Sequence, residues 1–97
     1  MDLKKIKKIK IGGHQYELVA KDGVTATEGS IGVCYITALK ISIDTAVPQS
    51  LQNEVLMHEI IEAINHNHEL ELEHEQITSL STALHQVFVD NPQLCFK

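Results

Sequence analysis

The stretch LMHEIIEAIN occupies residues 56–65 and lies inside the longest segment of this 97-residue chain with a helical apolar period. In an α-helix, positions four apart share a face, so His58 and Glu62 should lie one turn above the other. Glu59 should lie about 100° round the helix from His58. The spacing therefore predicts a helix that presents one imidazole and two carboxylates on neighbouring faces.

These three side chains nearly reproduce the HExxH motif. In that motif two imidazoles one turn apart bind zinc, and the Glu after the first His acts as general base on the metal-bound water. Here the second His position holds Glu62. A carboxylate oxygen also binds zinc, at about 2.0–2.2 Å, so the departure changes a ligand without removing it. We predict His58 and Glu62 as metal ligands and Glu59 as the catalytic general base.

A third ligand is expected from a second helix that begins near residues 71–75. Its first turn contains Glu73, His74 and Glu75. With His74, the set comprises two imidazoles and one carboxylate, and we predict His74 as the third ligand. Glu73 and Glu75 stay open as alternatives, because Glu73 lies nearer the centre of the apolar stripe of this helix. Zn²⁺ is the expected metal, although iron, manganese or nickel also suit such donors.

The rest of the chain predicts a single α+β domain. Alternating apolar residues predict short strands, and the pair Gly12-Gly13 between two alternating runs predicts a hairpin. Residues 21–30 are predicted as turn and loop. We expect a small N-terminal antiparallel β-meander followed by two packed α-helices. The expected ranges are strands within about 4–44, the metal-binding helix at about 49–66 and the second helix at about 72–90.

Composition excludes several classes of protein. The net charge of -5 and the pI near 5.6 argue against nucleic-acid binding, which needs a basic surface. No apolar run approaches the roughly 18 residues of a membrane helix, and no signal peptide is evident, so we expect a cytoplasmic protein without membrane contact. The cysteines Cys34 and Cys95 are too few for a disulfide framework. Five lysines crowd the first ten residues, where we expect a solvated strand face or a charged strand edge, with binding of an anionic partner as the alternative.

Together, the predicted hairpin, the helix with His58, Glu59 and Glu62, and the second helix resemble the very small HExxH-type proteins of phages and prophages, which belong with minimal gluzincin-like metallopeptidases. The resemblance implies a zincin-like fold and a zinc-dependent hydrolase in the cytoplasm of a bacterial host cell. It carries over His58 as ligand and Glu59 as general base. The matching segments are an I-x-I-x-G-x-x-Y-like hairpin at 9–16, a strand at 40–43, the active helix at 56–64 and a helix end at 86–92.

Three possible functions follow. As an enzyme, the protein would cleave a peptide or protein substrate that the strand at residues 40–43 holds by edge pairing. The alternative is a non-catalytic zincin-like binding or regulatory module with a structural or absent metal, which a closed site with Glu73 or His66 added would favour. A third option is an interaction protein whose acidic, His-rich face binds a basic partner. The substrate and the oligomeric state are left open.

Overall fold

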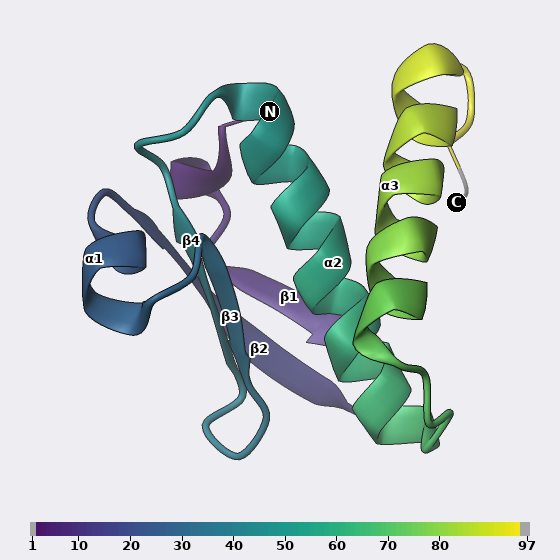
Figure 1. Cartoon of the computed structure of the whole chain (residues 1–97), viewed down its shortest axis with the longest axis horizontal. Coiled ribbons are helices and arrows are strands. Elements are labelled where there is room, and N and C mark those ends of the chain that lie inside the picture. Colours follow the sequence, from purple (N-terminus) through teal and green to yellow (C-terminus); the bar gives the residue numbers. More distant parts are fainter. Residues whose placement is uncertain (1, 96–97) are drawn as a thin grey trace.

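A computed structural model describes residues 2–95 of the chain. A four-stranded sheet is followed by two packed helices (Figure 1), which confirms the predicted α+β class. Within residues 2–95, no helix combines the length and apolarity that crossing a bilayer requires. The elements are η1 (Leu3–Lys5, a 3-10 turn), β1 (Lys8–Ile11), β2 (His14–Lys21), α1 (Val24–Glu28), β3 (Gly32–Tyr35), β4 (Lys40–Asp44), α2 (Gln49–His68) and α3 (His74–Asp90).

The first two strands form the predicted hairpin. β1 and β2 pair antiparallel on either side of Gly12 and Gly13. Gly12 has a φ of +62°, a left-handed conformation that glycine adopts without steric cost. β1 lies at an edge of the sheet, and its Lys8 and Lys10 side chains are exposed, as expected for a charged strand edge.

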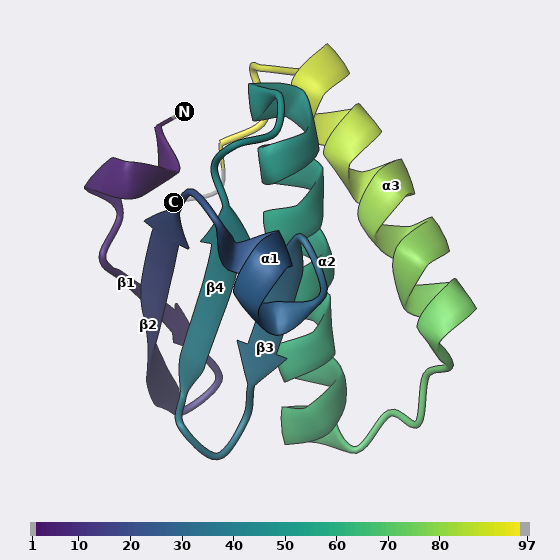
Figure 2. The same cartoon turned by 60° about the vertical axis from the view of Figure 1, so that its left-hand side comes forward.

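The sheet is mixed, whereas the sequence predicted an antiparallel meander. Its spatial order is β1-β2-β4-β3, and β2 pairs with β4 in parallel. After β2 the chain passes through α1 to the far edge, forms β3 there, and returns as β4 into the sheet (Figure 2). A central place suits β4, because Ile41 and Ile43 are buried on one face and Ser42 and Asp44 on the other.

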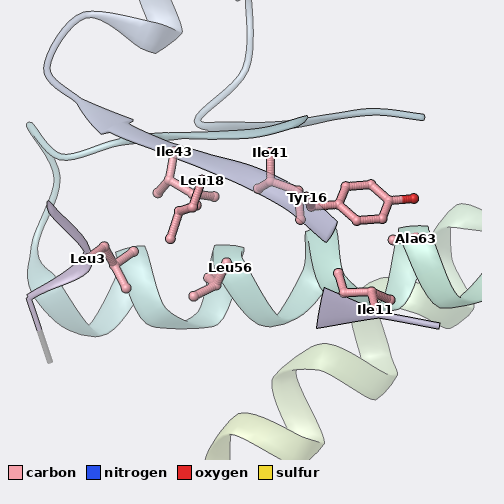
Figure 3. Close-up of a cluster of buried hydrophobic side chains, with 8 residues drawn as sticks. All are labelled: Leu3, Ile11, Tyr16, Leu18, Ile41, Ile43, Leu56 and Ala63. Atoms are coloured by element: carbon pink, nitrogen blue, oxygen red, sulfur yellow. The ribbon is translucent and has the colours of Figure 1, made fainter. Parts of the chain in front are cut away.

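The core lies between the sheet and α2 (Figure 3). Its buried side chains come from η1, β1, β2, β4 and α2. Burial of one large aliphatic side chain contributes about 1.5–3 kcal/mol, so this cluster fixes α2 on the sheet. The cluster consists of Leu3, Ile11, Tyr16, Leu18, Ile41, Ile43, Leu56 and Ala63.

α2 is covered on its other side by α3 and therefore lies between the sheet and a second helix (Figure 1). The most buried residues of α3 form one narrow stripe, since Ile77, Ser81 and His85 are its only residues that are not exposed. These positions are four apart and share a face. Because α2 is covered on both sides, it buries polar as well as apolar residues, including Gln52 and Glu59.

The short helix α1 lies where the sequence predicted turn and loop. The Asp44 carboxylate organises it: Oδ2 accepts hydrogen bonds from the backbone N–H and the hydroxyl of Thr25, at 2.9 and 2.6 Å. Oδ1 accepts from the backbone N–H groups of Gly23 and Ala46, at 3.3 and 2.9 Å. A helix that depends on a carboxylate so far along the chain has no local sequence signal, which explains the difference.

Asp44 also makes the stability of the fold sensitive to acid. The hydrogen bond from the Thr25 hydroxyl, followed by those from the Ala46, Thr25 and Gly23 amides, lowers the pKa of Asp44 from 3.8 to about 2. A lowered pKa stabilises the folded state above the ordinary pKa, and this stabilisation is lost as the pH falls through the folded pKa. We predict that Asp44→Asn lowers the melting temperature at neutral pH. Between about pH 4 and pH 2, the melting temperature of this variant should decrease less than that of the wild type.

Thermal unfolding followed by circular dichroism across this pH range measures both effects. Glu71→Gln is the matched control, because Glu71 is exposed in the connection between α2 and α3. An Asp44→Asn protein with the melting temperature and the acid profile of the wild type would contradict the role assigned to Asp44.

Candidate metal centre

α2 carries the first two side chains of the candidate centre. The helix follows Pro48, its N-cap, and ends before Glu69, which has a left-handed backbone conformation. His58 and Glu62 lie one turn apart, with His58 Nε2 and Glu62 Oε1 separated by 3.5 Å. Their side chains are 16% and 33% exposed, so both are shielded by the fold and still reachable from solvent.

His74, the first residue of α3, completes a cluster with these two side chains. Its Nδ1 atom is 4.0 Å from Glu62 Oε1, and the rings of His58 and His74 meet edge to face with centroids 5.1 Å apart. One potential ligand atom from each of the three side chains lies within 4.8 Å of the other two. The fold therefore brings together the three residues that the sequence predicts as ligands.

The alternative ligands lie elsewhere. Glu73 is the N-cap of α3: its side chain accepts from the backbone N–H of Gln76, and its own N–H donates to Gln76 Oε1 at 2.8 Å. This capping box engages the Glu73 carboxylate at the N-terminus of α3. Glu75 and His66 are exposed and lie outside the cluster. The geometry thus favours His74 over the other candidates.

The donor set fits a zinc ion in chemistry, and the distance between two of its donors fits as well. Zinc binds imidazole nitrogen and carboxylate oxygen at about 2.0–2.2 Å, so two donors of a tetrahedral site lie about 3.4 Å apart. The 3.5 Å between His58 and Glu62 matches this value. The 4.0 Å between His74 and Glu62 requires a small shift, which the 77% exposure of the His74 side chain leaves room for.

The surroundings of His58 favour the protonation state that a metal requires. Burial is the main cause that lowers the pKa of His58; the Glu62 carboxylate opposes the shift, and a positive charge on His74 adds to it. A lowered pKa keeps the imidazole neutral near neutral pH. Histidine must be neutral to bind a metal, so the environment of His58 favours the form that can act as a ligand.

Glu59 differs from its neighbours by its burial, with only 7% of the residue exposed. It packs against Gly32 of β3, where an added Cβ atom would lie 3.1 Å from Glu59 Oε2 and would collide with Val55 Cγ1. Burial first, and the negative charge of Glu62 second, raise the pKa of Glu59 to about 7. A carboxyl group with a pKa near neutrality can both accept and return a proton.

An open cleft of about 440 Å³ gives access to these groups. Its lining comes from α1, the residues between α1 and β3, the start of β3, α2 and α3. Because His58, Glu59 and His74 all line the cleft, a ligand in it can reach them. The lining residues are Thr25, Gly29, Ser30, Ile31, Gly32, Glu54, Val55, His58, Glu59, His74, Thr78 and Ser81.

The strand expected to hold a peptide, residues 40–43, cannot do so through a free edge. β4 pairs with β2 on one side and with β3 on the other. The free edge on this side of the sheet belongs to β3, whose first residue, Gly32, lines the cleft. The prediction was wrong because alternation of side chains gives the faces of a strand and does not give its place in the sheet.

Two residues that line the cleft, Gly32 and Glu54, were not predicted as site residues from the sequence. Gly32 has no sequence signal, because its role depends on the contact between β3 and α2. Glu54 does have one: it lies four residues before His58 and so shares its helix face. A search for carboxylates spaced by helical turns from His58 would have found it.

Comparisons with protein families, with curated proteins and with solved structures found no match to this chain. The resemblance to phage-encoded metallopeptidases therefore stays a proposal. Function has to be inferred from the geometry of His58, Glu59, Glu62 and His74.

Gly32 allows the close approach of α2 to β3, and its replacement tests that packing. We predict that Gly32→Ala destabilises the fold by about 1–3 kcal/mol, because overpacking forces Val55 and Glu59 to move. Chemical denaturation measures the loss. Removing the colliding methyl groups, as in Gly32→Ala with Val55→Ala, should restore part of the lost packing around Gly32.

Gly13→Ala is the matched control, since a Cβ atom there meets nothing within 4 Å. It should stay within about 0.5 kcal/mol of the wild type, as surface substitutions usually do. Equal stability of the Gly32→Ala and Gly13→Ala proteins would show that the approach of Val55 and Glu59 to β3 is looser than described.

The cluster itself predicts stoichiometric zinc binding. Protein purified without a His-tag should hold about one zinc ion per chain, as a single site with three protein ligands requires. Zinc at about 100 times its Kd should stabilise the fold by about 2.7 kcal/mol. His58→Ala, Glu62→Ala and His74→Ala should each lose both effects. Elemental analysis and zinc-dependent thermal unfolding measure them.

His66→Ala serves as control, because His66 lies on the same helix, is exposed and stands outside the cluster. It should bind zinc like the wild type. Absence of zinc after incubation at micromolar concentration, or its retention in all three ligand variants, would overturn the assignment.

Proposed function

We propose that this protein is a zinc-dependent hydrolase that cleaves peptide bonds, with His58, Glu62 and His74 holding the ion. The observation that carries the proposal is the meeting of three donor side chains from two helices at an open cleft, beside a buried carboxylate. A bound zinc ion would polarise a carbonyl oxygen and lower the pKa of water. The remaining chemistry belongs to the residues of the chain.

Glu59 would move the proton. It lies outside the three-residue cluster, so its carboxyl oxygens stay available when the ligands are occupied. Because its pKa is about 7, both protonation states are populated at neutral pH. The ionised carboxylate accepts a proton from the attacking water, and the protonated form delivers it to the leaving amine.

An extended peptide is the substrate that the surroundings support. β3 is an edge strand, and Ile31 and Gly32 line the cleft beside Glu59. Main-chain N–H and C=O groups at a free strand edge can pair with an added strand. Pairing along β3 would hold the scissile bond of the peptide near the cluster.

The proposed setting is the cytoplasm of a bacterial cell that hosts a phage or prophage. Cys34 and Cys95 are both free, as a reducing compartment would keep them. The net charge of -5 favours a peptide or protein partner over nucleic acid.

Glu59→Gln tests the proposal, because it removes the proton acceptor and keeps the size of the side chain. We predict that the zinc content and the fold stay native, while turnover of a mixed peptide pool falls at least about 100-fold. Mass spectrometry of the peptide products measures turnover, and elemental analysis measures zinc in the same samples.

Glu75→Gln is the matched control, since Glu75 is exposed on α3 and lies outside the cleft lining. It should turn over peptides like the wild type. Zinc bound at the cluster with no cleavage of any peptide by the wild type would refute the hydrolase and favour the binding module.

A further inference from the structure

Glu54 lines the cleft together with the candidate centre. It precedes His58 by four residues on α2, so it lies about 6 Å along the helix from that ligand and on the same face. Its side chain is 39% exposed. A molecule that occupies the cleft can therefore contact this carboxylate and the cluster at the same time.

Two side chains of the packed helix hold the Glu54 carboxylate in place. The Thr82 hydroxyl donates a hydrogen bond to Oε1 at 3.2 Å, and His85 Nδ1 lies 4.0 Å from Oε2. Both partners come from α3. A carboxylate fixed by neutral or weakly basic groups loses little freedom when it binds a cation, because its position is already set.

Among residues 2–95, no lysine forms an ion pair with this carboxylate. The lining of the cleft contains no lysine, and the chain has no arginine at all. In residues 2–95, the ion pairs of the carboxylates are made with histidines alone. Five of the eight lysines lie in the first ten residues. The cleft thus presents a fixed negative charge that is available to a ligand.

We infer that Glu54 binds a cationic group of the substrate, an ammonium or a guanidinium, about one helical turn from the scissile bond. This inference rests on the proposed function and names its substrate class: peptides with a positive charge near the cleaved bond. The charge can come from a Lys or Arg side chain or from a free amino terminus. Gly29 and Ser30 also line the cleft, and their small side chains occupy little of its volume.

The test measures peptide binding to the zinc-loaded Glu59→Gln protein, which retains ligands without turning them over. The probes are fluorescent heptapeptide pools that carry one Lys, one Arg or one norleucine, each with a free or an acetylated amino terminus. Charged pools should bind about tenfold more tightly than the neutral acetylated norleucine pool, as expected for a hydrogen bond to a charged group. Adding Glu54→Gln should abolish that difference.

The pools also separate the two sources of charge. Tighter binding of the acetylated Lys and Arg pools supports side-chain recognition. Tighter binding of the free-terminus norleucine pool supports recognition of the amino terminus. Equal affinity for all pools, or a preference that survives Glu54→Gln, overturns the inference. Thr82→Val should weaken the preference without abolishing it, since it removes only the hydroxyl that holds Glu54.

The failure of this inference and that of the proposed function can be told apart. Zinc content and melting temperature are measured for every variant, and Glu54→Gln should leave both unchanged. If zinc binds and Glu59 controls turnover while Glu54→Gln has no effect, the inference alone fails. If zinc does not bind, the same pools are applied to the metal-free protein, where a Glu54-dependent preference upholds cation recognition and its absence overturns it.

Discussion

The position of α2 between two covering layers is the constraint on which the rest of the structure depends. The sheet packs against one side of the helix and α3 against the other. A helix in this position cannot send all of its polar side chains into bulk water. Glu59 is therefore buried, and His58 and Glu62 are only partly exposed. The raised pKa of Glu59 follows first from this burial and then from the nearby charge of Glu62, so the chemistry of the site depends on the fold.

Features with a short repeat could be predicted from the sequence. The helical period places α2 and α3, and the glycine pair places the first hairpin, because each signal lies within a few residues. The parallel pairing of β2 with β4 could not be predicted, since alternation describes the faces of a strand and not its neighbours. α1 escaped prediction for a related reason: it depends on Asp44, which follows it only after another strand and turn.

The geometry of the candidate site could likewise be predicted only in part from the sequence. His58, Glu59 and Glu62 belong to one helix, so the period of 3.6 residues fixes their relative geometry. The choice between Glu73, His74 and Glu75 depends on how α3 is rotated about its axis. That rotation is set by the stripe that packs on α2 and by the capping box of Glu73, and neither contact follows from spacing. Gly32 and Glu54 gain their importance only through contacts between elements.

The narrow buried stripe of α3 has a thermodynamic consequence. A helix that buries only Ile77, Ser81 and His85 deeply can detach as a local unfolding event, with a smaller free energy than global unfolding. His74 would leave with it and open the cluster. Docking of α3 and binding of an ion would therefore be linked equilibria, in which each favours the other by the same free energy. The affinity of the centre would thus report how firmly one helix is docked, and hydrogen exchange along α3 would report how firmly the ion is bound.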